Sequence, residues 1–245
     1  MRQTRLYIEG QYSTGSILDI DAEKARYLGR VLRLRVGDSL VIFNGTGTAY
    51  GADITAFSRS SAALTVRDAI TVASESPLKV HLVQGISRGE RMDFVVQKAT
   101  ELGVKRITPL LTERGIVKLD DRRAEKRRQH WQKVAASACE QCGRVRLPLL
   151  DAPVRLDAWL GAKPNHIESD VVLRPGAEQS LAEIDMPATK VCILVGPEGG
   201  FSDAEYQLTE AAGFTAVSMG PRVLRTETAA AAALAILQAR WGDLR

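Results

Sequence analysis

Two segments in the last third of the chain share one pattern, in which a short apolar run is broken by Gly-Pro and followed by a helix-forming stretch. In the first segment, residues 191–195 predict a strand that ends at Gly196-Pro197, and Ser202 with Glu205 predicts a capped helix start. In the second, residues 214–219 predict a strand, Gly220-Pro221 ends it, and residues 226–241 predict a helix. We therefore expect two neighbouring strands that both end in Gly-Pro loops.

These two loops predict a binding pocket. In an open α/β sheet, the loops at the carboxyl ends of the strands form the ligand crevice, and glycines let the backbone come close to a ligand. Gly-Pro after a strand is also ordinary turn chemistry. However, the first loop carries Glu198 among its glycines, and the second carries Arg222, Arg225 and Glu227. Charges in glycine-rich loops favour the functional interpretation.

The composition is typical of a globular protein, with 45% hydrophobic and 25% charged residues in 245. The sequence has no apolar run long enough to cross a membrane, and its first residues are too polar for a signal peptide. Three cysteines are too few for a disulfide framework. We therefore expect a cytoplasmic protein that does not associate with a membrane.

Positive charge is concentrated in the middle of the chain. Residues 79–146 contain 16 basic and 8 acidic residues, whereas residues 147–245 contain 8 basic and 13 acidic residues. Such an excess attracts polyanions and makes their binding salt-dependent. Residues 122–128 alone also suit a solvated helix face, but the regional excess favours a nucleic-acid partner.

The order of predicted elements divides the chain into a β-rich domain at residues 1–72, a linker at 73–78 and an α/β domain at 79–245. In the first domain, short strands are predicted at 5–8, 39–43, 49–54 and 62–66, with one helix at 22–32. In the second, strands at 79–85, 106–111 and 170–173 and helices at 92–102 and 118–142 predict a parallel sheet.

Other common chemistries have little support. Cys139 and Cys142 have C-x-x-C spacing, but a second ligand pair is missing, so we expect no metal and interpret the pair as packing on one helix face, in a core or at a subunit interface. The sequence has no G-x-G-x-x-G or Walker loop for nucleotides and no G-x-S-x-G for a serine hydrolase.

Five motifs resemble one known family. They are GPEGGFSDAE at 196–205, GPRVLRTETA at 220–229, SRGERMD at 87–93, QKATELGV at 97–104 and ACEQCGR at 138–144. Taken in their order along the chain, they resemble the bacterial 16S ribosomal RNA uridine-N3 methyltransferases of the SPOUT superfamily. The resemblance covers essentially the whole chain. It implies a trefoil-knotted α/β methyltransferase domain with a parallel sheet, preceded by a small PUA-like β-barrel that binds RNA.

The resemblance also implies a cofactor, partners and site residues. The cofactor is S-adenosyl-L-methionine, the substrate is 16S rRNA in the small ribosomal subunit, and the enzymes are generally homodimers. The cofactor-binding residues implied are Leu173, Val195, Gly196, Pro197, Glu198, Gly199, Gly200, Met219, Gly220, Pro221, Val223 and Leu224. The family usually has histidine before the proline of the loop after residue 173, where this chain has Arg174.

The chemistry of methyl transfer to uracil N3 guides the choice of catalytic residues. The N3 proton must leave, so a base is needed, together with cations near the carbonyl oxygens. The candidates are Arg225, Glu227 and Glu198, the last as a base or as a structural acceptor for loop amides. Because N3 lies on the pairing edge, the uridine must be unpaired or flipped. RNA contacts are expected from Arg26, Arg30, Arg33, Arg88, Arg91, Arg122, Arg123, Arg127 and Arg128.

Three alternatives stay open at this point. A related SPOUT enzyme would methylate a ribose 2′-hydroxyl or another base. A non-catalytic RNA-binding factor for ribosome assembly would use the β-barrel and the basic segment, but would not need Arg225 and Glu227 in a glycine loop. A Rossmann-type oxidoreductase is disfavoured because its fingerprint is missing.

Overall fold

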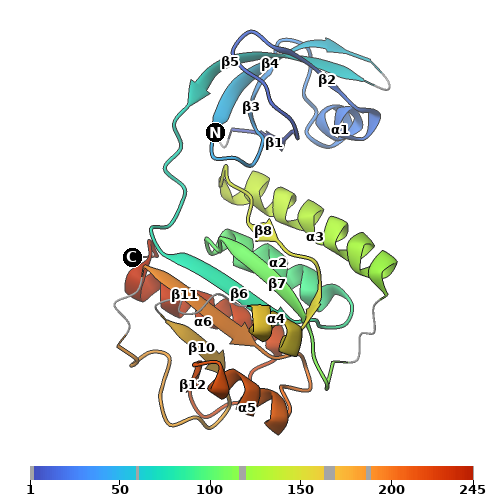
Figure 1. Ribbon diagram of the computed structural model, residues 1–245. Helices are drawn as coiled ribbons and strands as arrows, with labels where there is room; N and C mark the ends of the chain where they lie inside the picture. Colours follow the sequence, from blue (N-terminus) through green and yellow to red (C-terminus); the bar gives the residue numbers. More distant parts are fainter. Residues whose placement is uncertain (1–2, 59–60, 116–119, 163–168, 186–188, 245) are drawn as a thin grey trace. The chain divides into compact units, whose positions relative to one another are not determined.

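The computed structural model describes residues 3–58, 61–115, 120–162, 169–185 and 189–244, and contacts divide the chain into two compact units (Figure 1). Unit 1 consists of Met1–Ser74 and Cys139–Leu147, and unit 2 consists of Glu75–Ala138 and Pro148–Arg245.

Unit 1 is built on a curled five-stranded sheet (Figure 1). Its strand order is β1-β3-β4-β5-β2, with β1 and β3 parallel and the other pairs antiparallel. The strands are β1 (Arg5–Tyr7), β2 (Ile17–Ile20), β3 (Ser39–Phe43), β4 (Ala49–Phe57) and β5 (Ala62–Ile70). The core includes Leu6, Ile42, Ile54 and Leu64. Four of the strands confirm predicted segments; β2 was not predicted.

The helix predicted at 22–32 is wrong in its second half. Asp21 caps α1 (Ala22–Arg26) through the amide of Lys24, at 2.8 Å. The chain then widens into a π-helical turn, η1 (Tyr27–Val31), in which the Leu32 amide donates to the Tyr27 carbonyl oxygen. Propensity does not distinguish the two helix types, whereas tertiary packing does.

The segment Cys139–Leu147 belongs to unit 1, whereas the order of elements in the sequence predicts that residues 139–147 belong to the second domain. Cys139 and Val145 pack with Val41, Phe43 and Ala49. The Tyr7 amide also donates a 2.8 Å hydrogen bond to Glu140 Oε1. The last turn of a helix can therefore pack in a different core from the rest of the same helix.

Unit 2 contains a parallel sheet in the order β12-β10-β11-β6-β7-β8, with β9 also paired to β7. The strands are β6 (Lys79–Gly85), β7 (Arg106–Leu111), β8 (Leu149–Leu150), β9 (Val154–Arg155), β10 (Asp170–Leu173), β11 (Lys190–Val195) and β12 (Thr215–Val217). The predicted parallel sheet is confirmed.

Helices cover both faces of this sheet. They are α2 (Glu90–Glu101), α3 (Asp121–Cys142), α4 (Leu156–Ala162), α5 (Asp203–Ala211) and α6 (Thr226–Trp241) (Figure 1). Side chains alternate along a strand. Ile193 and Val195 therefore join a core with α2, α3 and α6, while Cys192 and Leu194 join a core with α4 and α5.

The sheet order corrects one expectation about the two Gly-Pro loops. The strands that precede them, β11 and β12, are not neighbours, because β10 lies between them and pairs with both. The segment after β12 then runs against the segment after β10: the Ser218 amide donates to the Gln179 carbonyl oxygen, and the Leu181 amide donates to Ser218. A third loop, after β10, is thereby brought between the other two.

Several local expectations are also resolved. The capping box at Ser202 and Glu205 is confirmed, with both reciprocal hydrogen bonds present. Strand β12 is shorter than residues 214–219, and β8, β9 and α4 were not predicted. The predicted helix start at residue 118 lies outside the described residues. Residues 73–78 form no helix or strand, but Ser76 is buried and donates to Gln238 Oε1 at 2.6 Å.

Candidate active site

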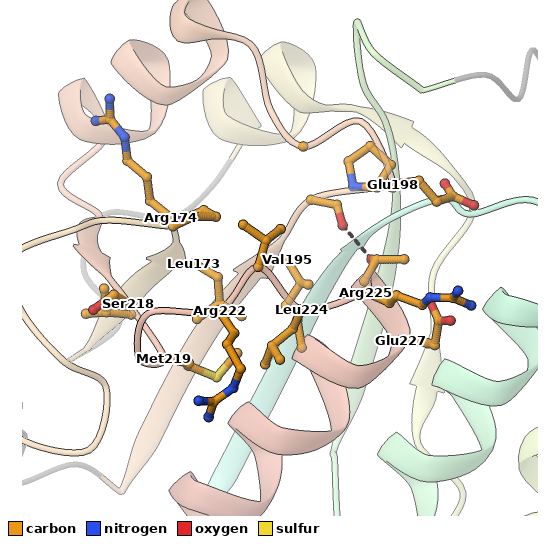
Figure 2. A pocket seen from close by; sticks show the side chains of 18 of the residues that line it. Leu173, Arg174, Val195, Glu198, Ser218, Met219, Arg222, Leu224, Arg225 and Glu227 are labelled. Carbon is orange, nitrogen blue, oxygen red and sulfur yellow. Dashed lines mark hydrogen bonds between the residues drawn. The ribbon is translucent and has the colours of Figure 1, made fainter.

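A pocket of about 440 Å³ opens at the carboxyl ends of β10, β11 and β12 (Figure 2). The predicted cofactor residues that line it are Leu173, Val195, Gly196, Pro197, Glu198, Gly200, Met219, Gly220, Val223 and Leu224. Two other predicted residues, Gly199 and Pro221, do not line it. Gly199 instead packs against Arg114, which lies 3.1 Å from the position that a Cβ at this residue would occupy. The structure thus gathers most of the predicted set around one cavity.

Two glycines at or beside the pocket, Gly85 and Gly220, are required for different structural reasons. A Cβ on Gly85, at the end of β6, would lie 2.5 Å from the Pro197 nitrogen, so the first Gly-Pro loop rests directly on this strand end. Gly220 has φ +80°, a left-handed conformation that β-branched residues rarely adopt. The two Gly-Pro loops therefore depend on glycine for close approach in one case and for backbone geometry in the other.

A buried polar network joins these loops. Thr226 Oγ1 donates to the Gly196 carbonyl oxygen at 2.6 Å, a hydrogen bond drawn in Figure 2. Gln84 Nε2 donates to Thr226 Oγ1 at 2.9 Å and to the Gly85 carbonyl oxygen at 3.1 Å. Gln84 is fully buried. Neither Gln84 nor Thr226 was predicted as a site residue from the sequence, although an amide at the end of an otherwise buried strand is a usable signal.

Glu198 is held by two arginines. Its Oε1 accepts hydrogen bonds from the Arg88 amide at 3.0 Å and from Arg91 Nη1 at 2.8 Å. Burial raises the pKa of Glu198, but the hydrogen bonds from the Arg88 and Glu198 amides and the charge of Arg91 outweigh it, so the pKa lies below its usual value. A carboxylate with a lowered pKa is a weak proton acceptor. This geometry favours the structural interpretation of Glu198.

Arg225 and Glu227 stand at the start of α6. Both line the pocket, and Figure 2 shows them extending toward the side where Glu198 lies, whereas Arg222 points elsewhere. The Oε2 atom of Glu227 is buried and has no hydrogen-bond partner among the described residues. A buried carboxylate oxygen without a partner is costly, so this atom is suited to receive a group from a ligand.

Arg174 and Tyr206 line the pocket on the side opposite Arg225 and Glu227. Tyr206 was not predicted as a site residue from the sequence. The Arg174 guanidinium lies 4.8 Å from the centre of the Tyr206 ring, a cation–π contact. The Tyr206 hydroxyl donates to the Leu173 carbonyl oxygen at 3.3 Å, and burial raises the pKa of this phenol. Arg174, which replaces the histidine expected from the resemblance, is thus fixed beside the pocket.

A second hollow of about 690 Å³ in unit 2 is strongly basic. It is lined by Gly89, Asp93, Arg123, Lys126, Arg127, Gln129, His130, Trp131 and Lys133, which we call the basic groove. Asp93 is engaged with His130 Nε2 at 2.7 Å and with Trp131 Nε1 at 3.1 Å, so it does not neutralise the cations fully.

The predicted RNA-binding arginines fall into separate groups. Arg123 and Arg127 line the basic groove, Arg122 is exposed nearby on α3, and Arg128 is paired with Glu125 at 2.8 Å. Arg91 lines the active-site pocket, and Arg88 contributes its amide to Glu198. In unit 1, Arg26, Arg30 and Arg33 are exposed. Within unit 2, the predicted arginines are thus divided between the basic groove and the active-site pocket.

The residues that the structure describes contain no group of three His, Cys, Asp or Glu side chains that could hold a metal ion. No helix among them is both long and apolar enough to cross a membrane. Cys139 is buried in unit 1, and Cys142 is exposed.

Comparison with known proteins identifies the family. Residues 74–238 match the model of an RNA methyltransferase domain, and residues 20–67 match that of an RNA methyltransferase PUA domain. The ribosomal RNA small subunit methyltransferase E of Buchnera aphidicola is 34% identical over 241 residues, which cover 98% of this chain and 95% of the relative. The chain belongs to this methyltransferase E family.

Two solved structures extend the likeness to this family in three dimensions. The ribosomal RNA small subunit methyltransferase E of Neisseria gonorrhoeae, bound to S-adenosyl methionine, has a TM-score of 0.91 and 37% identity, and 100% of each chain is covered. A methyltransferase from Legionella pneumophila in complex with the bound cofactor SAM has a TM-score of 0.94 and 42% identity, again with full coverage of both chains. The predicted fold class, a knotted α/β SPOUT domain preceded by a PUA-like domain, is confirmed.

Proposed function

We propose that this protein transfers a methyl group from S-adenosylmethionine to N3 of a uridine in the 16S rRNA of the small ribosomal subunit. The observation that carries the proposal is the three-loop pocket. On one side it has Arg225 and the buried Oε2 of Glu227, which has no hydrogen-bond partner among the described residues. Membership in the family supports the reaction class, and the long motifs at 196–205 and 220–229 support the uridine N3 target.

The pocket suits the cofactor in size and lining. Its volume of about 440 Å³ lies within the range of small-molecule sites. Leu173, Val195, Met219 and Leu224 supply apolar surface for an adenine ring, and the glycine loops bring backbone amides and carbonyls close to polar groups. When bound there, S-adenosylmethionine supplies an electrophilic methyl group on its sulfonium.

The residues at the start of α6 would act on the uracil. Glu227 would accept the N3 proton. This role is supported by its Oε2 atom, which is buried in the pocket lining without a hydrogen-bond partner among the described residues. Arg225 would stabilise the negative charge that develops on a neighbouring carbonyl oxygen. Glu198 would keep Arg91 and the loop after β6 in place, because it is already engaged by both.

Binding of the RNA would involve both units. The basic groove places Arg123, Lys126, Arg127 and Lys133 on one hollow of unit 2, which suits phosphate contacts. We further propose that residues 1–72, together with Cys139–Leu147, form an RNA-binding domain, and that the rest of residues 79–245 forms the methyltransferase domain, with residues 73–78 as the linker. Arg26, Arg30 and Arg33 would contribute from the first of these domains.

The cellular setting follows from the substrate. An enzyme that acts on the small ribosomal subunit would work in the cytoplasm, and we propose a homodimer on the basis of the SPOUT resemblance. The alanine-rich face of α6 does not support a dimer by itself, because Ala230 and Ala233 are buried in the core of unit 2. Light scattering after gel filtration would measure the oligomeric state directly.

The decisive experiment combines the purified protein, labelled S-adenosylmethionine and small ribosomal subunits that lack N3-methyluridine. We expect label in 16S rRNA, recovered as N3-methyluridine after nucleoside digestion and mass spectrometry. Recovery as 2′-O-methylnucleoside would indicate a SPOUT enzyme with another target. Cofactor binding without any transfer to free rRNA or to assembled subunits would contradict the proposal.

A further inference from the structure

The exposed surface of α1, η1 and the residues that follow them, up to Val36, combines apolar and cationic side chains in unit 1. Arg26, Tyr27, Arg30, Val31, Arg33 and Val36 are all exposed, and we call them the Tyr27 surface. Tyr27 is 39% exposed, while Val31 and Val36 are 66% and 58% exposed. Ala25 and Leu28 face the opposite way and are buried. An aromatic ring and two aliphatic side chains are thus displayed among three arginines.

The backbone beneath this surface is fixed by packing. Leu28 is fully buried, and Gly29 lies so close to Phe57 that a Cβ there would be 2.8 Å from the ring. The Leu34 amide also donates to the Leu28 carbonyl oxygen at 3.0 Å. The π-helical turn Tyr27–Val31 is therefore held on both sides of Gly29. A rigidly mounted aromatic side chain loses little entropy when it binds a planar partner.

The same segment stores backbone strain at an arginine. Among the described non-glycine residues, Arg33 alone has a positive φ, +57°. π-Helical turns and strained residues cluster at functional sites, because packing must maintain them against their intrinsic cost. No ion pair to Arg30 or Arg33 is found between described residues. Their charges are therefore available to an anionic partner.

We infer that the Tyr27 surface binds a single-stranded segment of RNA, with the Tyr27 ring stacked on a base and Arg30 and Arg33 at the flanking phosphates. This inference rests on the proposed function and adds to it a base-stacking contact. Exposed aromatic side chains among cations are the features that distinguish single-strand binding from duplex binding, since bases in a duplex are stacked on one another. The duplex would be held by the arginines alone.

The test compares three variants of the full-length protein by fluorescence anisotropy with a labelled single-stranded RNA of about ten nucleotides and with the corresponding duplex. Tyr27→Ala is expected to weaken single-strand binding about tenfold and to leave duplex binding unchanged. Tyr27→Phe keeps the ring and should retain wild-type affinity. Ile17→Ala, which removes another exposed apolar side chain of unit 1, should also have no effect (Ile17 is 70% exposed).

The salt dependence of RNA binding distinguishes the contribution of the Tyr27 ring from that of the arginine charges. Tyr27→Ala should leave the slope of log affinity against log salt unchanged, whereas Arg30→Gln should weaken both RNAs and reduce that slope by about one. Equal single-strand affinity for Tyr27→Ala and the wild type would overturn the inference. Equal losses on single strand and duplex would also overturn it, because a stacking contact has no counterpart in the duplex.

The methylation assay keeps this inference distinct from the proposed function. With small ribosomal subunits as substrate, Tyr27→Ala should raise KM and leave kcat and cofactor affinity at wild-type values. If the wild type methylates uridine N3 and Tyr27→Ala has an unchanged KM, the inference alone fails. If the wild type binds single-stranded RNA through Tyr27 but methylates no N3, the proposed function alone fails.

Discussion

Thr226, the first residue of α6, donates a 2.6 Å hydrogen bond to the carbonyl oxygen of Gly196, thirty residues earlier in the chain. This contact joins the two Gly-Pro loops, whose strands are separated in the sheet by β10. One buried hydroxyl group therefore helps to hold the two loops of the pocket together.

Replacing this hydroxyl tests the connection. In Thr226→Val the Gly196 carbonyl loses a donor, and the Gln84 amide loses an acceptor, in a buried site. We expect the free energy of unfolding to fall by about 1–3 kcal/mol and cofactor affinity to fall about tenfold. Denaturant unfolding and calorimetric titration with S-adenosylmethionine measure both effects. Thr226→Ser should behave like the wild type. An unchanged cofactor affinity in the valine variant would show that the hydrogen bond between the two loops does not contribute to cofactor binding.

Gly220 should be intolerant of β-branched residues. Because its φ is +80°, Gly220→Val would strain the loop by about 1–2 kcal/mol or move it. We expect binding of S-adenosylmethionine to be lost in calorimetric titration while the protein stays folded. Gly220→Asn is the control, since asparagine tolerates the left-handed region. NADH should not bind to the wild type or to either Gly220 variant. Binding of NADH to the wild type would favour the oxidoreductase alternative.

The role of Glu227 is tested by its amide variant. Glu227→Gln keeps the shape of the side chain but cannot accept a proton, so we expect kcat for methyl transfer to fall about 100-fold. Cofactor affinity should stay near the wild-type value. The activity of this variant should recover as the pH rises, because the free uracil then loses its own N3 proton. A variant with full activity at neutral pH would remove Glu227 from proton transfer.

Glu198 predicts a pH-dependent contribution to stability. Its pKa is lowered in the folded protein, so its contribution is fully present above the ordinary glutamate pKa and is lost as the pH falls through the folded value. We expect Glu198→Gln to have a lower Tm than the wild type at neutral pH, and the difference to shrink in acid. Differential scanning calorimetry across this range measures it. A difference that does not change with pH would exclude the ionic contribution.

Two neighbouring arginines, Arg127 and Arg128, test whether the basic groove binds RNA. Arg127 lines the groove, whereas Arg128 is bound to Glu125 through two 2.8 Å hydrogen bonds. Arg127→Gln should therefore weaken RNA binding and flatten its salt dependence more than Arg128→Gln does. Combined neutralisation of Arg122, Arg123, Arg127 and Arg128 should have a larger effect and leave cofactor affinity unchanged. Unchanged RNA affinity at several salt concentrations would exclude this segment from the interface.

Features that depend on neighbouring residues were predictable from the sequence. The capping box at Ser202 and Glu205 is a local interaction across three residues, and its hydrogen bonds form as expected. The Gly-Pro breaks after β11 and β12 likewise follow from residue type. Most of the predicted cofactor residues line one pocket because these loops do lie at the carboxyl ends of parallel strands.

Features that depend on distant contacts were not predictable. No local pattern indicates that β10 inserts between β11 and β12, or that Tyr206 on α5 reaches the Leu173 carbonyl. The last turn of α3 joins unit 1 because Cys139 fits against Phe43, and a helix pattern carries no information about that partner. The π-helical turn depends on Gly29 meeting the Phe57 ring, which lies on another element.

The buried hydrogen bond between Ser76 and Gln238 spans 162 positions, and the three pocket loops all come after residue 173. During synthesis, the β6 strand therefore leaves the ribosome long before α6 exists to cover it. Contacts of such long range form slowly and late. Cofactor binding by nascent chains of increasing length would thus begin only once α6 has emerged, which makes the ligand itself a reporter of completed folding.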